Sequence, residues 1–475
     1  MNELIGRNRE CAELQRCIES DRSELVIVYG RRRVGKTFLI EEFFNQNFDF
    51  RYVGAHGKTT RRQLRNFAHV LGRHSRQKYD FKDWDEAFYA LEDYLGQLPT
   101  DRKLIVFIDE MPWMDSGRSN FVTALENFWN GWAMSRRNIM LIATGSATSW
   151  MRDKLIANKG GLHARITARI HISPFTLQET EKYLESRNIE WDRYHITQAY
   201  MLLGGVPFYY SLLSPALSLA QNIDELFFGG DGALKVEFDE LYTALFNNAD
   251  QYLAVVKLLS ENKRGLTCSE ISKMLSFNGG KISTIIKNLE RSDIIEQWRQ
   301  FGNKKRGTIY RLTDFYTLFY YKFVEPNHSK DANWWSNNIN SRSIESWMGN
   351  CFELVCMKHH AQIKEALGIR GMSTEISTWQ VLPNEADKTE GAQIDMIIER
   401  ADRIIHLCEM KFSQDVYHIT KDYDKHIRER AGLFKYITGT KKTIVNTFIT
   451  TYGVANGKYR SIVHSDVTMD DLFES

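Results

Sequence analysis

The chain has 475 residues, of which 43% are hydrophobic and 12% aromatic, with only seven prolines. This composition excludes a disordered chain, and the length predicts about three packed domains on a prior of roughly 150 residues each. The formal net charge is +2, so nucleic-acid binding would need a local basic surface. Because no run of about 18 apolar residues is present, we expect a cytoplasmic protein that does not enter a membrane.

The first strong pattern is a glycine-rich turn between an apolar strand and an amphipathic helix. Residues 25–29 (LVIVY) predict a buried parallel strand, and residues 30–37 have the sequence GRRRVGKT. This pattern in this context predicts a loop whose backbone N–H groups surround a phosphate chain. Lys36 would reach the β- and γ-phosphates, and the Thr37 hydroxyl would bind Mg²⁺. The expected nucleotide contacts of the loop are Gly30, Arg31, Arg32, Arg33, Val34, Gly35, Lys36, Thr37 and Phe38.

Helices and a second apolar strand are expected after this loop. Residues 52–97 have apolar positions at helical spacing, which predicts helices that pack on the core. Residues 104–110 (LIVFIDE) then form an apolar strand that ends in two carboxylates. Asp109 would hold the Mg²⁺ shell, and Glu110 would orient or deprotonate the attacking water. A solvated acidic turn is the alternative.

The next strand, residues 139–146, ends in small hydroxylated residues. In a parallel sheet its end should lie in the crevice beside the preceding strand. Ser146 is the favoured contact to the γ-phosphate or the water, with Thr144 as the alternative. Either hydroxyl could instead cap the following helix.

Two arginines follow before residues 171–175. Arg165 is the candidate for stabilising charge on the γ-phosphate, in cis or from a neighbouring subunit, and Arg169 is the second choice. A solvated arginine is the alternative. Helices are expected over residues 177–220, interrupted at residues 204–207 (GGVP). This break predicts a hinge in a helical lid.

Six motifs occur in the order Gly6-Arg7, residues 30–37, residues 108–110, residues 144–146, the Arg165 segment and residues 205–207. Together they resemble the archaeal-type ATPase family, a branch of the STAND/AAA+-related P-loop ATPases. The resemblance covers about residues 1–240. It implies an ATPase core with ATP and Mg²⁺ as cofactors, a helical lid, and Gly6 and Arg7 near the adenine.

Residues 249–326 predict a winged helix. An apolar helix at residues 252–259 precedes a second helix that begins after Thr267, where Glu270 completes a capping box. A third helix at residues 281–290 and two strands around a tip at residues 302–307 (GNKKRG) follow. Residues 281–311 hold eight Lys/Arg and three Asp/Glu, which favours DNA as a partner, although such modules also bind proteins. The candidate DNA contacts are Lys281, Thr284, Lys287, Lys304, Lys305 and Arg306.

The C-terminal part combines three acidic residues and a lysine. Glu353 lies on an apolar helix, Asp395 on a strand, and Glu409 and Lys411 on one face of the next strand. Carboxylates that bind Mg²⁺ beside a lysine that positions water suit attack on a phosphodiester. The segment resembles the PD-(D/E)xK nuclease superfamily, although Ile394 stands where the prototype has proline. Lys421 and Tyr423, in the following helix, are expected to face solvent, and contact with the substrate is the alternative.

The predicted fold is therefore α/β, with four parts. We expect a P-loop ATPase domain at residues 1–175, a helical lid and connector at 176–248, a winged helix at 249–326 and a restriction-endonuclease-like domain at 327–475. The expected function is ATP hydrolysis that controls DNA binding and a metal-dependent nuclease-like domain. The alternative is a regulatory switch that binds DNA or a protein partner without cleavage. A homo-oligomer stays open.

Overall fold

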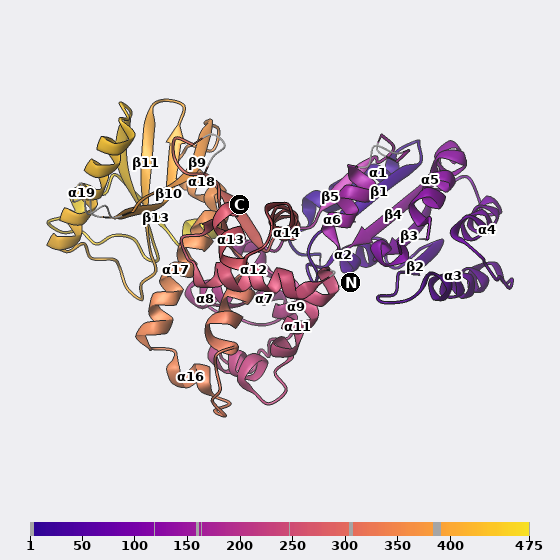
Figure 1. The fold of residues 1–475 in the computed structure, drawn as a ribbon, viewed down its shortest axis with the longest axis horizontal. Coiled ribbons are helices and arrows are strands. Elements are labelled where there is room, and N and C mark those ends of the chain that lie inside the picture. The colour runs from indigo at the N-terminus through magenta and orange to yellow at the C-terminus, as the bar shows by residue number, and fades with distance from the viewer. Residues whose placement is uncertain are drawn as a thin grey trace. The chain divides into compact units, whose positions relative to one another are not determined.

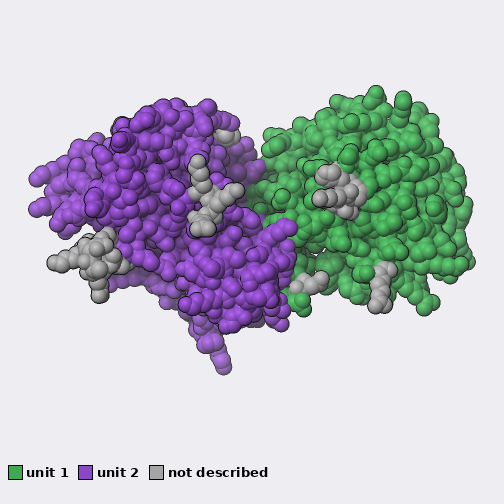
Figure 2. Space-filling model, turned by 45° about the horizontal axis from the view of Figure 1, so that its top comes forward, with its two compact units in different colours: residues 1–174, 240–249, 291–293 green, residues 175–239, 250–290, 294–475 purple. Residues whose placement is uncertain are grey.

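The computed structural model describes residues 4–117, 119–157, 161–162, 164–246, 248–303, 307–382 and 391–474. The chain forms two compact units (Figure 2). Unit 1 comprises Met1–Pro174, Glu240–Ala249 and Arg291–Asp293, and unit 2 comprises Phe175–Asp239, Asp250–Glu290 and Ile294–Ser475. Within the described ranges, no helix is both long and apolar enough to cross a lipid bilayer.

Unit 1 is built on a five-stranded parallel sheet of order β2-β3-β4-β1-β5. The strands are β1 (Glu24–Tyr29), β2 (Phe50–Val53), β3 (Leu104–Asp109), β4 (Ile139–Gly145) and β5 (Ala168–His171). β1, β3 and β4 are apolar and almost wholly buried, as a parallel sheet covered on both faces requires. These three strands confirm the sequence prediction, whereas β2 lies partly in a stretch predicted as helical. Its four residues are too few to show a period.

Helices cover both faces of this sheet (Figure 1). One core cluster joins the sheet to α3 (Thr60–Ser75), α4 (Trp84–Gly96) and α5 (Phe121–Gly131). The other joins it to α1 (Asn8–Glu19) and α2 (Lys36–Phe43). The carboxyl ends of the central strands β1, β3 and β4 therefore meet at one edge of a two-sided α/β domain, where ligands of such sheets bind.

Unit 2 begins with short helices: α7 (Leu177–Ser186), α8 (Arg193–Leu203), α9 (Pro207–Ser211) and α10 (Leu219–Ile223), with α11 (Ala233–Leu245) next along the chain. The break between α8 and α9 falls at the predicted glycines. A Cβ on Gly205 would lie 2.0 Å from the backbone oxygen of Phe175. The break therefore needs glycine because the chain at Phe175 passes against it.

The next segment contains α12 (Ala249–Glu261), β6 (Leu266–Thr267), α13 (Cys268–Leu275), α14 (Gly279–Arg291), β7 (Ile295–Trp298) and β8 (Ile309–Leu312). The strands form an antiparallel sheet of order β6-β8-β7. The capping box of Thr267 and Glu270 is present, as expected. Asn288 on α14 is half-buried, and its amide donates to the Tyr252 hydroxyl at 2.8 Å.

Aromatic residues hold the centre of unit 2 together. α15 (Phe315–Phe319) continues into a π-helix at Tyr320–Val324, and α16 (Trp334–Asn338) follows. Phe319 and Phe323 pack against Trp335 and Trp347 with ring centroids 5.1–5.9 Å apart. This cluster explains the aromatic run in the sequence, since aromatic side chains contribute a large buried area.

The last part of unit 2 is a mixed sheet of order β13-β12-β11-β10-β9. Its elements are α17 (Arg342–Lys358), α18 (His360–Ala366), β9 (Thr374–Val381), β10 (Ala392–Arg400), β11 (Ile404–Lys411), α19 (Lys421–Thr438), β12 (Thr443–Thr450) and β13 (Ser465–Thr468). β9, β10 and β11 pair antiparallel, and β11, β12 and β13 pair parallel. β10 and β11 confirm the predicted hairpin. The register of β10 against β9 shifts between Ile394 and Ile397, so Asp395 lies in an irregular stretch.

Candidate functional site

The loop between β1 and α2 has the backbone conformation of a phosphate-binding turn. Arg33 and Gly35 have positive φ angles of 73° and 91°, and a positive φ is uncommon for a residue that carries a Cβ. At Gly30, a Cβ would lie 2.3 Å from the backbone oxygen of Ile172, so only glycine fits. Gly35 is the N-cap of α2, so the unpaired amides at the start of this helix lie next to the loop.

The amino group of Lys36 is buried inside this loop. It donates hydrogen bonds to the backbone oxygens of Gly30 and Arg31, at 3.1 and 2.9 Å, and to the Ser146 hydroxyl at 2.9 Å. Burial lowers the pKa of Lys36, and the Glu110 carboxylate partly opposes this shift. A buried cation held by polar oxygens is suited to accept a phosphate as its counter-charge.

Thr37 and Asp109 face each other across the gap between α2 and β3. The Thr37 hydroxyl donates to both carboxylate oxygens of Asp109, at 3.1 and 3.0 Å, and the Thr144 hydroxyl donates to Oδ1 of the same carboxylate. Burial raises the pKa of Asp109, while the hydrogen bond from Thr144 acts in the opposite direction. These oxygens are the hard ligands that Mg²⁺ prefers.

Glu110 is held in a strained position directly after β3. Its φ angle is 47°, in the left-handed region that residues with a Cβ rarely adopt. A Cβ on Gly54 would lie 2.4 Å from its backbone oxygen, so the neighbouring strand end must be glycine. The Glu110 carboxylate accepts hydrogen bonds from the amide of Ser146, at 3.1 Å, and from its hydroxyl. Glu110 and Lys36 therefore share Ser146 as a common neighbour.

Thr144, in β4, and Ser146, directly after it, contact different side chains of the site. Thr144 contacts Asp109 and accepts the Glu110 amide at 3.2 Å. Ser146 contacts Lys36 and Glu110. Ser146 was favoured for the γ-phosphate, and its position beside the lysine suits that role. The contacts of Thr144 with Asp109 and Glu110 were missed. The order of residues along β4 does not tell which hydroxyl lies next to the end of β3.

Gly6 and Arg7 lie against the same loop. Gly6 has a φ angle of 68°, and the buried guanidinium of Arg7 donates to the backbone oxygens of Val34, at 3.2 Å, and Ser173, at 3.0 Å. Arg7 therefore ties the N-terminal turn to both sides of the nucleotide loop. Phe38, one turn into α2, is 42% exposed.

The predicted arginines of the γ-phosphate lie on the surface of unit 1. Arg165 is exposed in a turn, where its amide donates to the backbone oxygen of Leu162 at 2.9 Å. Arg169 is exposed on β5. Among the described residues, no hydrogen bond or ion pair joins either side chain to Lys36 or Glu110, so a role at the phosphate stays a prediction.

Two short segments from later in the chain belong to unit 1. Glu240 lies 3.9 Å from the guanidinium of Arg32 in the nucleotide loop. Arg291, the last residue of α14, donates to Asp153 at 2.7 Å, and Asp153 lies in the π-helix Met151–Ile156 that follows β4. The nucleotide domain therefore includes the segment before α12 and the end of α14.

The predicted DNA contacts on α14 are on its outer surface. Thr284 and Lys287 are exposed, and the Lys281 ammonium lies 4.1 Å from the centre of the Phe277 ring. The opposite face is buried through Ile282, Ile285, Ile286 and Leu289. The other three predicted contacts, Lys304, Lys305 and Arg306, lie outside the described residues.

The acidic residues of the C-terminal sheet are joined to cations. Met396 pairs with Cys408 across β10 and β11, and Asp395 and Glu409 are the next residues beyond this pair. Glu409 is 8% exposed and pairs with Lys411 at 2.9 Å and with Arg430 at 2.5 Å. Burial alone would raise the pKa of Glu409, but the charges of Arg430 and Lys411 lower it to about 2.

Asp395 has a cation from another part of unit 2 as its partner. Arg311 of β8 donates to Asp395 at 3.1 Å, and the Gln393 amide donates to it at 2.6 Å. The carboxylates of Asp395 and Glu409 both act on Glu353 of α17. Burial is the largest cause, followed by the charge of Asp395, and together they raise the pKa of Glu353 to about 8. Glu353, Asp395 and Arg311 line a cavity of about 730 Å³ together with Lys263 and Arg264.

This arrangement differs from a metal centre made of acids alone. Among the described residues, no group of three or more histidines, cysteines and acids is placed to hold a metal ion. Two of the three predicted ligands are instead paired with cations. Asp395 pairs with Arg311, and Glu409 pairs with Lys411 and Arg430. Metal binding at these three acids therefore stays a prediction, and the geometry observed here gives it no support.

Three partners of this acidic cluster were missed or misplaced by the sequence. Tyr423 was expected to face solvent, but its hydroxyl donates to the Glu409 carboxylate. Arg430 lies seven residues further along α19, a spacing that places both side chains on one helix face. That spacing was a usable signal. Arg311 was counted only as part of a basic wing, and no local pattern links it to Asp395, 84 residues away.

Comparison with known proteins identifies the N-terminal part. Residues 4–213 match a family described as an ATPase domain predominantly from Archaea. An uncharacterised protein of Methanocaldococcus jannaschii is 23% identical over 329 residues, which cover 69% of this chain and 70% of that protein. An uncharacterised ATP-binding protein of the same organism is 45% identical over 40 residues, 8% of this chain and 68% of that one.

Two solved structures are similar at low identity. A Walker-type ATPase of Pyrococcus abyssi is 19% identical with a TM-score of 0.47, covering 67% of this chain and 96% of that chain. The ORC2 protein of Aeropyrum pernix is 15% identical with a TM-score of 0.43, covering 75% of this chain and 96% of that chain. The family match and the loop geometry together make residues 4–213 an ATPase domain of archaeal type.

Proposed function

We propose that this protein hydrolyses ATP at the loop of residues 30–37 and that its nucleotide state controls a DNA-directed output in unit 2. The observation that carries the proposal is the meeting of five side chains near the carboxyl ends of β1, β3 and β4. Lys36 is buried beside Ser146, Thr37 bonds Asp109, and Glu110 bonds Ser146. Each is the residue type that its place in phosphoryl transfer requires.

The residues present fit a bound nucleotide and its metal. Lys36 would exchange its hydrogen bonds to the loop oxygens for the β- and γ-phosphates, while the amides at the start of α2 bind the same phosphates. Thr37 and Asp109 would hold Mg²⁺, which neutralises charge on the phosphates when bound. Glu110 would orient a water and accept its proton, and Ser146 would fix the position of the Glu110 carboxylate.

The proposed output begins with a DNA-binding winged helix at residues 249–326. Its support is the order of helices and strands from α12 to β8, together with the exposed polar face of α14. Of the two later segments that cluster with the nucleotide domain, Glu240–Ala249 leads into α12 and Arg291–Asp293 follows from the end of α14. The ion pair of Arg291 and Asp153 lies within unit 1, and it is the proposed route from the segment after β4 to the end of α14.

This control is testable by measuring DNA affinity in the presence of ATP and of ADP. Glu110→Gln should bind ATP without hydrolysing it, so its DNA affinity should stay at the value of the ATP-bound protein. Arg291→Ala should keep ATP hydrolysis and remove the difference between the two nucleotides. An unchanged difference in Arg291→Ala would contradict this route, and equal affinity with both nucleotides in the wild type would contradict nucleotide control itself.

The second proposed output is a nuclease-like domain at residues 327–475. Its support is the α17-β9-β10-β11-α19-β12 order with Asp395, Glu409 and Lys411 on the central hairpin. A non-cleaving switch is the second candidate, and a specific observation favours it: Arg311 and Arg430 occupy the carboxylates that a metal would need.

A nicking assay separates the two candidates. Supercoiled plasmid and single-stranded DNA are incubated with Mg²⁺ or Mn²⁺ and with the wild type, Asp395→Ala, Lys411→Ala or Arg311→Ala. A nuclease should nick in the wild type and lose activity in the first two variants. Arg311→Ala should nick faster if this arginine restrains Asp395. Equal nicking by all four proteins would indicate contamination, and no nicking with intact DNA binding would support the non-cleaving switch.

A further inference from the structure

A second basic surface lies on unit 1, far along the sequence from the predicted winged helix. Residues 58–79 contain seven lysines and arginines and no aspartate or glutamate. Most of this stretch is α3 (Thr60–Ser75), which packs on the core through Leu64, Phe67 and Leu71. The local charge of +7 contrasts with the +2 of the whole chain. This stretch is therefore much more basic than the chain as a whole.

The cations of α3 share one face of the helix. Arg61, Arg65, His69 and Arg73 recur every four residues, and each step rotates by about 40° at 3.6 residues per turn, so they cover an arc of about 120°. Arg62 falls within the same arc, and all five side chains are exposed. From Arg61 to Arg73 the face is about 18 Å long at 1.5 Å per residue.

The charge at the start of α3 does not stabilise the helix that carries it. Arg61 and Arg62 lie in the first turn, at the positive end of the helix dipole, where acidic residues are favoured and none is present. Like charges four residues apart also repel. Within the described part of the chain, no ion pair relieves this repulsion at Arg61, Arg65 or Arg73. An anionic partner that binds this face from outside the protein would neutralise these charges and explain why they lie together.

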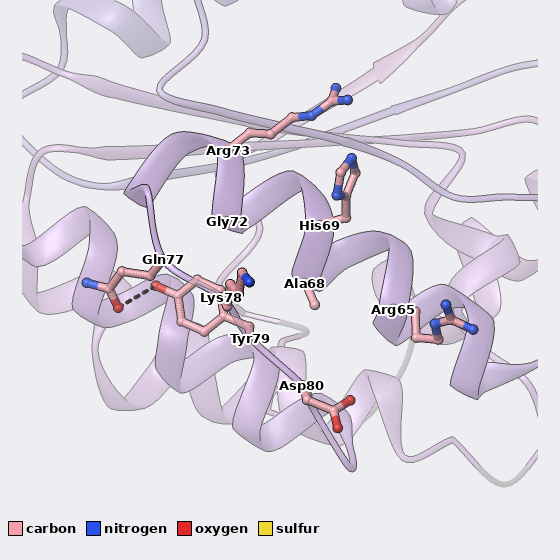
Figure 3. A pocket seen from close by; sticks show the side chains of 9 residues that line it. All are labelled: Arg65, Ala68, His69, Gly72, Arg73, Gln77, Lys78, Tyr79 and Asp80. Carbon is pink, nitrogen blue, oxygen red and sulfur yellow. Dashed lines mark hydrogen bonds between the residues drawn. The ribbon is translucent and has the colours of Figure 1, made fainter.

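A pocket lies beside this face, and Figure 3 shows the residues that line it. The chain leaves α3 and returns beside it through Lys78, Tyr79 and Asp80, which leaves a cavity of about 460 Å³ lined also by Arg65 and Arg73. Tyr79 is half-buried and stacks on Phe81 with ring centroids 5.3 Å apart. An aromatic ring beside arginines is the combination that binds phosphates and accepts a stacked base.

We propose that this surface, the α3 basic face (Arg61, Arg62, Arg65, His69 and Arg73), binds the phosphodiester backbone of a nucleic acid. Over about 18 Å a B-form strand presents about five phosphates, at 3.4 Å per nucleotide. This number matches the five side chains of the face. A membrane surface is disfavoured, because an interfacial helix inserts its apolar side and the apolar side of α3 is buried in the core.

The α3 basic face goes beyond the proposed winged-helix contact and does not depend on it. Backbone contacts by arginine carry little sequence information, so this face positions nucleic acid on unit 1 without selecting a sequence. Nucleic acid would then contact the nucleotide domain itself, in addition to the predicted contacts on α14.

The test compares salt dependence of binding in the full-length protein. Fluorescence anisotropy is measured with a duplex DNA of mixed sequence, a single-stranded DNA and a duplex RNA at several salt concentrations. The triple variant Arg61→Ala, Arg65→Ala and Arg73→Ala should lower affinity on every sequence. It should reduce the slope of log K against log salt by about 1 per lost contact, about 3 in all for duplex DNA. Alanine preserves the helix, so the ATPase rate without nucleic acid should not change.

Matched variants separate charge from other effects. The triple variant with lysine at the same three positions should keep the slope, because the charge is retained. Lys82→Ala, whose side chain is 88% exposed on the same unit, should change the slope much less than the alanine triple. A slope that is unchanged in the alanine triple overturns the proposal and leaves the winged helix as the contact. Binding of the wild type to phosphatidylserine vesicles but to none of the nucleic acids also overturns it.

Discussion

Arg311 of β8 donates a hydrogen bond of 3.1 Å to Asp395 of β10, and its side chain is only 6% exposed. This ion pair joins the small antiparallel sheet to the C-terminal sheet within unit 2. Backbone contacts join the same two parts, since the Phe301 amide donates to Thr378 of β9 at 2.8 Å. The predicted winged helix and the predicted nuclease-like domain are therefore one packed body.

Loss of this arginine should destabilise unit 2. Arg311→Ala leaves Asp395 largely buried without its cation, so we expect the free energy of unfolding to fall by about 3 kcal/mol in chemical denaturation. Arg264→Ala, an exposed arginine of the same cavity, should change stability by about 0.5 kcal/mol or less. Equal effects of the two variants would show that the ion pair does not hold the sheets together.

Glu110→Gln should separate nucleotide binding from turnover. The amide keeps an acceptor for the Ser146 backbone amide but cannot take a proton from water, so ATP hydrolysis should fall about 100-fold or more. Phosphate release gives the rate, and titration with a fluorescent ATP analogue gives the affinity, which should be retained. Glu19→Gln, an exposed acid on α1, is the control. Hydrolysis at the wild-type rate would refute the role given to Glu110.

Gly205→Ala should damage the turn that follows α8. The added Cβ would lie 2.0 Å from the backbone oxygen of Phe175 and 2.7 Å from its nitrogen, and neither backbone atom can move without disturbing the chain. We expect a loss of about 2 kcal/mol or more in unfolding free energy. Gly349→Ala is the matched control, because this glycine lies within α17 and its Cβ would meet nothing within 4 Å. That change should stabilise by about 0.5–1 kcal/mol.

His359 should make the stability of unit 2 depend on acidity. Its Nε2 accepts the Leu177 amide at 3.0 Å and its Nδ1 donates to the Val355 oxygen at 2.8 Å, so the folded ring is neutral. Burial lowers the pKa of His359 to about 4, against about 6.5 unfolded. The unfolded chain therefore binds the proton first as pH falls, and the stability present above pH 6.5 is lost progressively toward pH 4.

The expected size of this effect is about 3 kcal/mol between pH 6.5 and 4. His359→Gln keeps one acceptor and one donor without a titrating group, so its unfolding free energy should fall less steeply over this range. The comparison is made by chemical denaturation at each pH, because other groups titrate in both proteins and cancel in the difference. Parallel curves would show that His359 does not titrate on unfolding.

The nucleotide loop was predictable from the sequence because its chemistry is local. Residues 30–37 lie between one strand and one helix, and the backbone geometry of so short a turn follows from its glycines and its lysine. The carboxylates of Asp109 and Glu110 were predictable for a related reason: an apolar strand that ends in acids reaches the same edge of a parallel sheet. The buried strands β3 and β4 were predictable from the sequence because their apolar residues form unbroken runs.

The short edge strand β2 and the strands β9, β12 and β13 were not predicted, since their residues alternate weakly and only pairing with neighbours fixes them. The partners of buried charge were equally hidden. Asp395 looked like a metal ligand because its strand context fits one, but the structure pairs it with an arginine 84 residues earlier. Which cation neutralises a buried acid depends on which elements pack together, and no local pattern encodes that.

The sequence by itself thus located the nucleotide loop of unit 1 and the side chains of Lys36, Asp109 and Glu110 that the structure brings together beside it. It also contained the seven cations of residues 58–79. Only the tertiary structure decided that four of them lie on one exposed face of α3 without acidic partners, and that the acids of the C-terminal sheet are shared with arginines. Local motifs fix the chemistry of a turn or a strand end, whereas the charge that a side chain meets is fixed by packing between distant elements.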